Sequence, residues 1–188
     1  IWLTDYPQGQ LYYNNAGTMM DRNLGATSAT PGDVCVLGLK YQWGRKDPFL
    51  GSSSIREPIL AKSTNTWYEV SCSNSSVGSI DYSVRNPMTF IKAGDYYDWL
   101  YYDHYSQVDR SRWGKEKTIY DPCPSGWKVP DVAFYYASRF HTQSNGYDSE
   151  KYGRRFSNNG VEVWYPNTGQ LLSLNSFTYF DYGLYWTS

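Results

Sequence analysis

Catalysis by a side-chain nucleophile needs a base close to it, and the sequence offers few groups that could serve as that base. The chain contains two histidines, His104 in a tyrosine-rich segment and His141 at the end of an expected helix. Neither belongs to a G-x-S-x-G or H-E-x-x-H pattern, which would position a nucleophile or a zinc-bound base. We interpret both as surface or capping residues. We therefore expect no catalytic residues and no enzyme activity.

Metal binding and redox chemistry also lack a supporting pattern. The three cysteines are Cys35, Cys72 and Cys123. No C-x-x-C spacing occurs, so neither a zinc site nor a thioredoxin-type site is indicated. The 18 acidic residues could include a glycosidase pair, but nothing in the sequence selects one. The carboxylates of Asp95, Asp98 and Asp103 do not follow EF-hand spacing and are expected to be solvated. We predict no metal and no cofactor.

The aromatic content favours recognition. The 188 residues include 20 tyrosines, 8 tryptophans and 7 phenylalanines. Tyrosine offers a large contact area at low entropic cost and keeps a polar tip, which is typical of binding surfaces. The alternative is that most of these rings fill a loop-rich core. The net charge of −1 argues against a nucleic-acid partner, and no apolar run approaches the about 20 residues that span a bilayer.

The segment Lys117–Pro130 (KTIYDPCPSGWKVP) is the strongest signal among the elements that must position any site. Its three prolines fix φ and remove backbone donors, which excludes a regular helix or a central strand. A turn at Ser125-Gly126 and a short extended stretch follow. Asp131 is placed to cap a helix that we predict over Val132–Phe140. The segment is therefore expected to form a rigid corner.

The rest of the chain predicts short elements joined by long loops within one α+β domain. A second short helix is expected within Asp95–Tyr105, and Ser52–Ser83 is expected to be a long loop with a strand or two. The predicted strands lie within Gly17–Asn23 (before a turn at Asn23-Leu24-Gly25), Leu39–Gly44, Val161–Tyr165 (before a turn at Pro166–Gly169) and from Leu184 onward.

Five motifs occur in order along most of the chain: MDRNLGATSATPGD (Met20–Asp33), GLKYQWGRKDPF (Gly38–Phe49), NPMTFI (Asn86–Ile91), WGKEKTIYDPCPSGWKVP (Trp113–Pro130) and GLYWTS (Gly183–Ser188). Together they resemble the Fibrobacter succinogenes major paralogous domain (FISUMP) family of bacterial surface proteins. The resemblance implies a C-type-lectin-like fold with short twisted antiparallel strands, one or two short helices and long loops. It also implies an exported module, extracellular or associated with the outer membrane, as a single domain over residues 1–188.

The resemblance carries further expectations. Family members usually continue past the segment that ends here at Ser188 to a strand with a cysteine, the natural partner of Cys123. We therefore expect a domain truncated at its C-terminal end, with Cys35 and Cys72 as a candidate second bridge. The lectin calcium site needs paired carboxylate and amide oxygens, which Tyr165-Pro166-Asn167 and Glu57-Pro58-Ile59 lack.

We interpret the charged and aromatic motif residues as scaffold, in which Arg22 or Arg45 pairs with Asp21 or Asp47. These structural residues are Asp21, Arg22, Trp43, Arg45, Asp47, Cys123 and Trp127. Ligand contacts are expected from the late Tyr/Asn/Ser-rich loops, through Tyr147, Tyr152, Trp164, Tyr165, Asn167, Tyr179, Tyr182 and Tyr185. The predicted function is non-catalytic adhesion or recognition of a glycan or protein ligand. The alternative is a structural role, as a tip or accessory subunit of a surface fibre or lipoprotein complex.

Overall fold

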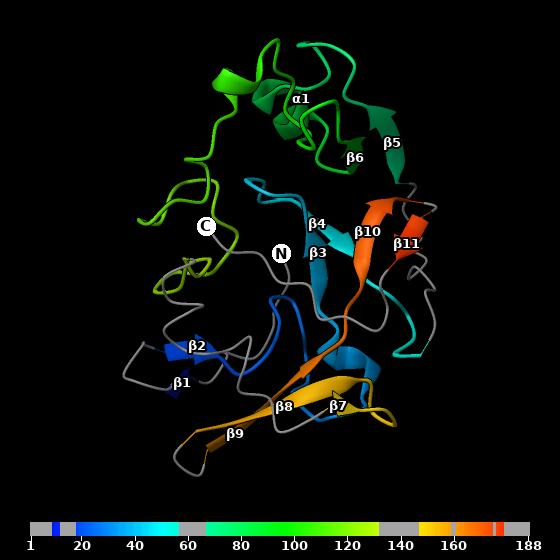
Figure 1. The fold of residues 1–188 in the computed structure, drawn as a ribbon, viewed down its shortest axis with the longest axis vertical. Helices are drawn as coiled ribbons and strands as arrows, with labels where there is room; N and C mark the ends of the chain where they lie inside the picture. The colour runs from blue at the N-terminus through cyan, green and yellow to red at the C-terminus, as the bar shows by residue number, and fades with distance from the viewer. Residues whose placement is uncertain are drawn as a thin grey trace.

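A computed structural model describes residues 9–11, 18–56, 67–131, 147–158, 161–174 and 176–178. Within these ranges the chain forms small sheets of two or three strands and few helices, a mixed architecture compatible with the α+β class (Figure 1). In chain order the elements are β1 (Gly9–Leu11), β2 (Thr18–Met20), the 3-10 helix η2 (Val34–Val36), β3 (Leu39–Tyr41), β4 (Pro48–Leu50), β5 (Tyr68–Ser71), α1 (Ile80–Arg85), β6 (Thr89–Lys92), the 3-10 helix η3 (Tyr105–Gln107), β7 (Tyr147–Asp148), β8 (Gly153–Asn158), β9 (Val161–Pro166), β10 (Gln170–Ser173) and β11 (Ser176–Thr178).

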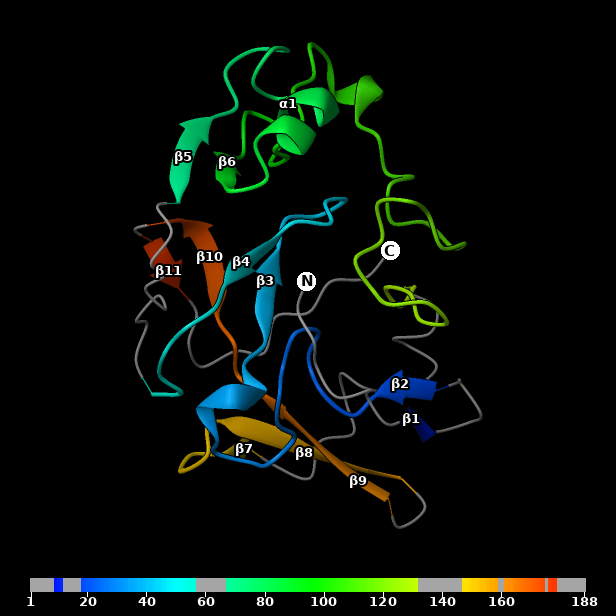
Figure 2. The same cartoon turned by 180° about the vertical axis from the view of Figure 1, so that it is seen from behind.

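The sheets lie in different parts of the molecule. Strands β1–β2, β3–β4 and β10–β11 pair as antiparallel hairpins, and β7–β8–β9 form an antiparallel sheet of three strands. Strands β5 and β6 pair in parallel, with α1 between them in the chain. Figure 2, seen from behind, shows β7–β9 at one end and β5, β6 and α1 at the other, with β3, β4 and β10 between them.

Three predicted strands are confirmed. Strands β2 and β3 fall inside the ranges expected for them, and β9 covers the alternating segment VEVWY plus Pro166. The predicted turn before η2 is also present, because the amide of Ala26 donates to the carbonyl oxygen of Asn23 over 2.9 Å. Gly25 has φ +81° in this turn, a conformation that glycine adopts without steric cost.

One helix prediction and one loop prediction are corrected by the structure. The segment Asp95–Tyr105 is not an α-helix: it forms turns, and Tyr97 has a left-handed φ of +58°. The Asp98 carboxylate accepts the amide of Leu100, a local bond that competes with helix formation. Helix α1 begins inside Ser52–Ser83, the range expected to be a long loop with a strand or two, and ends just beyond it at Arg85. Its N-cap Ser79 accepts the amide of Tyr82 over 3.1 Å, which was a readable signal.

Other expectations fall outside the described residues. The predicted helix over Val132–Phe140 and the strand from Leu184 belong to this group, and so does the capping role of Asp131. Among the described residues, no helix combines the length and the apolar character that crossing a membrane requires.

The interior joins the central hairpin to the β5–β6 end of the molecule. Buried rings include those of Phe49, Phe90, Trp99 and Trp113. The side-chain amide of Gln42 takes the place of a neighbouring strand for Ile91. Its Nε2 donates to the carbonyl oxygen of Ile91 over 2.7 Å, and its Oε1 accepts the Ile91 amide over 3.3 Å. These bonds satisfy backbone groups that have no strand neighbour there.

Candidate functional site

The structure does not place the predicted late-loop residues on one outer face. Tyr147 is exposed and Tyr152 is half-buried, with a left-handed φ of +53°. Three others are buried and do not lie on an outer face: Trp164, Tyr165 and Asn167 are 6%, 4% and 4% exposed. The remaining candidates, Tyr179, Tyr182 and Tyr185, lie outside the described residues.

The burial of the β9 rings has a local cause. A side chain at Gly153 of β8 would put its Cβ 2.2 Å from a ring carbon of Trp164, so the indole packs directly against the glycine backbone. The hydroxyl of Tyr165 donates to the carbonyl oxygen of Met20 over 2.6 Å. The alternating pattern predicts the strand but does not tell which of its faces meets water.

The motif residues interpreted as scaffold form the predicted ion pairs. Arg22 Nε lies 2.9 Å from a carboxylate oxygen of Asp21, and Arg45 Nε lies 2.9 Å from a carboxylate oxygen of Asp47. The guanidinium of Arg45 is 2% exposed and also donates to the Thr89 carbonyl oxygen over 2.7 Å. Arg45 therefore joins the loop after β3 to the start of β6, and burial lowers its pKa while Asp47 opposes that shift.

The cysteines do not form the candidate bridge. All three are free: Cys35 is exposed within η2, whereas Cys72 is buried against Ile91 and Trp99. The proposed pairing of Cys35 with Cys72 is therefore wrong. Burial raises the pKa of Cys123 to about 12, so this thiol is protonated at neutral pH and is a poor nucleophile. Among the described residues, no cluster of three or more His, Cys, Asp or Glu side chains could hold a metal ion.

An exposed group of aromatic and acidic side chains lies on the segment from Gly94 to Tyr105, beside α1 (Figure 1). Tyr97 is 95% exposed and Tyr105 is 61% exposed. The ring of Tyr96 packs at 6.0 Å from that of Tyr105, centroid to centroid. We call the exposed side chains Asp95, Tyr97, Asp103, His104 and Tyr105, together with the half-buried Tyr96, the tyrosine surface.

Buried side chains beneath the tyrosine surface hold its loop in place. Trp99 is 3% exposed, and its indole nitrogen donates to the Trp43 carbonyl oxygen over 2.7 Å. Arg112 lies over the Trp43 and Trp99 rings at 4.6 and 5.0 Å and forms an ion pair with Asp98. The expectation that Asp98 is solvated is therefore wrong, while Asp95 and Asp103 are exposed as expected.

Backbone bonds complete the attachment of this loop. The amide of Gly94 donates to the Asp98 carbonyl oxygen over 3.0 Å, and the amide of Tyr101 donates to the Gly78 carbonyl oxygen over 2.9 Å. A Cβ at Gly78 would lie 2.5 Å from the Cys72 sulfur, so glycine permits this close approach. The loop thus presents Tyr97 from a position fixed on both sides.

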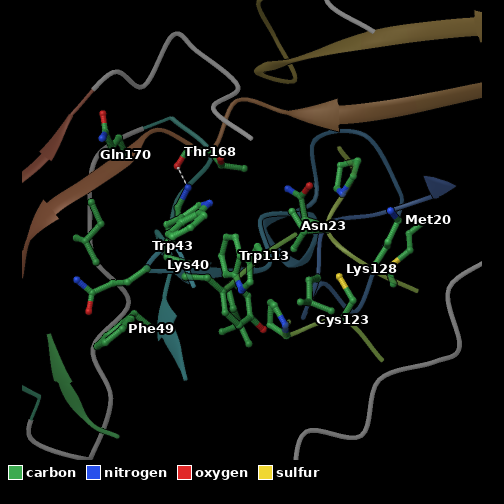
Figure 3. Close-up of a pocket in the computed structure, with 18 of the residues that line it drawn as sticks. Met20, Asn23, Lys40, Trp43, Phe49, Trp113, Cys123, Lys128, Thr168 and Gln170 are labelled. Atoms are coloured by element: carbon green, nitrogen blue, oxygen red, sulfur yellow. Dashed lines mark hydrogen bonds between the residues drawn. The ribbon is translucent and has the colours of Figure 1, made fainter. Parts of the chain in front are cut away.

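A cavity of about 890 Å³ lies between β2, β3 and the rigid corner, and Figure 3 shows its lining. Its wall is largely apolar and includes the aromatic rings of Trp43, Phe49 and Trp113. Trp43 and Trp113 lie 6.0 Å apart, centroid to centroid. Tyr97 also borders the cavity, so the cavity and the tyrosine surface adjoin. The scaffold residues Cys123 and Trp127 form part of the wall on the side of the corner.

Lys40 is a half-buried cation of the cavity wall. Its Nζ donates to the carbonyl oxygens of Thr168 and Gly169 over 2.5 and 2.8 Å, which ties β3 to the turn after β9 (Figure 3). Burial lowers the pKa of Lys40 to about 7, because desolvation disfavours its charged form. This amine is therefore only partly protonated at neutral pH.

Replacing Lys40 with methionine should change how stability depends on pH. Since the pKa of Lys40 is about 7 in the folded chain and about 10.5 when unfolded, the unfolded state binds more protons between these values. Wild-type stability should then rise from pH 7 to 10 relative to Lys40→Met, by at most roughly 1.4 kcal/mol per pH unit. Urea unfolding of both proteins at several pH values measures the difference. A constant difference across this range contradicts the assignment.

Sequence reasoning missed several residues that build this region. Arg112 and Asp121 are buried at 1% and 2% exposure, yet neither was singled out. The available signal for Asp121 was its position directly before Pro122-Cys123-Pro124, where amides of a proline-rich turn need an acceptor. No local signal identifies Asp98 as the partner of Arg112, because the two lie fourteen positions apart.

Comparison with known proteins adds no relative: no family model matches the chain, and no curated protein or solved structure shows significant similarity to it.

Proposed function

We propose that the chain is a C-type-lectin-like module, displayed outside a bacterial cell, that binds a glycan or protein ligand through the tyrosine surface without catalysing a reaction. The observation that carries this proposal is the 95% exposure of Tyr97. The two residues that follow it are anchored, because Asp98 forms an ion pair with Arg112 and Trp99 is buried. The five motifs that resemble the FISUMP family support the lectin-like fold and the extracellular location.

The tyrosine surface has the physical properties of a binding site. A large ring exposed to water gains from being covered, because its apolar face leaves water while the hydroxyl keeps a polar partner. The fixed backbone around Tyr97 lowers the entropy lost when a ligand binds. The φ of +58° is unfavourable for tyrosine, and such strain is found at functional sites more often than elsewhere.

Acidic and phenolic groups at this surface can orient a bound ligand through hydrogen bonds. Asp95 and Asp103 are exposed beside the rings, and a hydrogen bond to Asp103 raises the pKa of Tyr101. The Tyr101 phenol therefore stays protonated at neutral pH. Carboxylates that accept hydrogen bonds next to a flat ring suit sugar hydroxyls and peptide amides equally well. The tyrosine surface is therefore chemically compatible with a glycan and with a protein ligand.

Replacing Tyr97 with alanine should remove binding without changing the fold. The wild-type protein and its variants would be applied to printed glycan and peptide arrays. We expect Tyr97→Ala to lower the signal on every bound feature at least about tenfold, the loss of roughly 1.4 kcal/mol or more expected for a central aromatic contact.

Tyr147→Ala is the matched control, because Tyr147 is also an exposed tyrosine but lies on β7 at the opposite end of the molecule (Figure 1). Both variants should unfold within about 0.5 kcal/mol of the wild type, since both rings are on the surface. Loss of binding in Tyr147→Ala with retention in Tyr97→Ala contradicts the proposal. Self-association that removes all array binding favours a structural subunit instead.

A further inference from the structure

The cavity between β2, β3 and the rigid corner has a size that suits a small molecule. Its volume of about 890 Å³ falls within the roughly 300–1,000 Å³ typical of ligand pockets. The proposed function at the tyrosine surface gives this cavity no role, because the two only adjoin at Tyr97. The kind of molecule that it could bind follows from the groups in its wall.

The wall presents aromatic rings that are held in place by the protein. Trp43 and Trp127 line the cavity and are half-buried, so part of each side chain is accessible to a ligand. The buried Trp113 lies 6.0 Å from Trp43, centroid to centroid, and Arg112 lies over the Trp43 ring at 4.6 Å. Because these contacts fix Trp43 in advance, less entropy is lost when a ligand binds. Such rings favour flat ligands through offset stacking.

The charged side chains in the described part of the wall already have protein partners. These lining residues are Arg22, Lys40, Asp98, Lys128 and Asp131. Arg22 pairs with Asp21 through two nitrogen atoms, over 2.9 and 3.0 Å. Lys128 lies 3.7 Å from Asp131, so these two lining charges neutralise each other. Neither pair leaves a net charge for a ligand to meet.

Lys40 and Asp98 are also committed to protein groups. Lys40 Nζ donates to the carbonyl oxygens of Thr168 and Gly169 over 2.5 and 2.8 Å, and Figure 3 shows the contact with Thr168. Asp98 forms its ion pair with the buried Arg112. A charged ligand would therefore have to displace one of these contacts or lie in a largely apolar wall without a counter-charge. Both alternatives cost free energy, so the wall selects against charge.

We propose that this cavity binds a small, flat, uncharged molecule whose apolar rings stack on Trp43 and Trp127. A charged molecule of the same shape would gain the same ring contacts but would lose the hydration of its charge. The site is separate from recognition of a large ligand at the tyrosine surface, so either can fail without the other.

The test compares two fluorescent probes that share one ring system and differ in charge. The neutral probe is N-phenyl-1-naphthylamine, and the anionic probe, 8-anilinonaphthalene-1-sulfonate, adds a sulfonate to it. Titrated into the whole chain at pH 7, the neutral probe should bind saturably, with one molecule per chain. It should bind at least about tenfold more tightly than the anionic probe, because no group of the wall is free to compensate the sulfonate. Equal or tighter binding of the sulfonate overturns the proposal.

A matched pair of variants locates the bound probe. Leu172 lines the cavity, is 47% exposed and lies where the register of β10 shifts, so a polar residue is compatible with the fold there. Leu172→Glu puts a carboxylate beside the apolar ligand and should weaken the neutral probe at least about tenfold. Val84→Glu is the control, because Val84 is 70% exposed on α1 and is not a lining residue. Its affinity should equal that of the wild type.

Unchanged affinity in Leu172→Glu, or an equal loss in Val84→Glu, overturns the proposal. The comparison of the two probes on the wild-type chain decides the question alone if Leu172→Glu shows no cooperative thermal transition. Light scattering of the wild type and Leu172→Glu tests the other occupant, a second copy of the chain. Self-association that Leu172→Glu abolishes would assign this wall to an interface between copies and would also overturn the proposal.

Discussion

Replacing Asp98 with alanine is expected to lower the free energy of unfolding by roughly 3–5 kcal/mol, because it removes the nearer of the two carboxylates beside the buried Arg112 and leaves only Asp109, at 3.9 Å from Nε. Arg112 is 1% exposed, and two of its nitrogen atoms, Nε and Nη1, have no hydrogen-bond partner among the described residues. Asp98 also accepts the hydroxyl of Tyr102 over 3.2 Å and the amide of Leu100 over 3.3 Å. Asp98→Ala therefore removes the ion pair with Arg112 together with these two hydrogen bonds.

Chemical denaturation followed by tryptophan fluorescence measures the loss. Asp95→Ala is the matched control, since it removes an exposed carboxylate three positions away and should cost less than about 0.5 kcal/mol. The double variant Asp98→Ala, Arg112→Met should recover a large part of the lost stability, because no uncompensated charge remains. A double variant that is as unstable as the sum of the single variants would contradict this account.

Replacing Asp121 with alanine is expected to cost about 3 kcal/mol, because its carboxylate organises the proline-rich corner. One oxygen accepts the Cys123 amide over 2.8 Å and the other accepts the Val129 amide over 2.8 Å. Lys117 Nζ adds an ion pair at 3.1 Å. Alanine leaves two amides without acceptors, and that of Val129 is buried, where an unmade bond costs about 1–3 kcal/mol.

Hydrogen exchange at the Val129 amide is the direct readout for Asp121→Ala. The exchange rate should rise by more than the global loss of stability explains, because the local acceptor is gone. Glu116→Ala removes an exposed carboxylate of the same region and should leave both stability and exchange unchanged. Unchanged protection of Val129 in Asp121→Ala would show that the corner is held by its prolines alone.

The parts of the fold that sequence reasoning predicted correctly depend on local patterns. The alternation in VEVWY predicts β9, and the expected pairing of Arg45 with Asp21 or Asp47 is found with Asp47, two positions away. The turn at Gly25 follows from a conformation that glycine adopts without cost. In each case the interacting groups lie within a few residues of each other, so their spacing along the chain is enough to predict the contact.

The errors arise where tertiary contacts override local preference. The apolar spacing in Asp95–Tyr105 fits a helix, but Trp99 and Asp98 are drawn toward Trp43 and Arg112, and the backbone turns at Tyr97 to allow both contacts. Likewise, Trp164 is buried because Gly153 on the neighbouring strand leaves room for its ring. Neither partner can be identified from the segment that it affects.

These corrections move the predicted binding surface without changing its chemistry. The sequence favoured late-loop tyrosines, whereas the most exposed ring in the described part of the chain is Tyr97. Tyrosine content indicates that some rings face outward, but burial decides which ones, and burial depends on packing between distant segments.

The most direct test of the account is a titration of the protein labelled with 3-fluorotyrosine, followed by ¹⁹F NMR, using a ligand found on the arrays. Single Tyr→Phe variants assign the resonances. Recognition through the tyrosine surface predicts that the signals of Tyr97 and Tyr105 shift with ligand, while that of Tyr147 stays in place. Shifts confined to Tyr147 and Tyr152, with Tyr97 unchanged at saturation, would contradict the account.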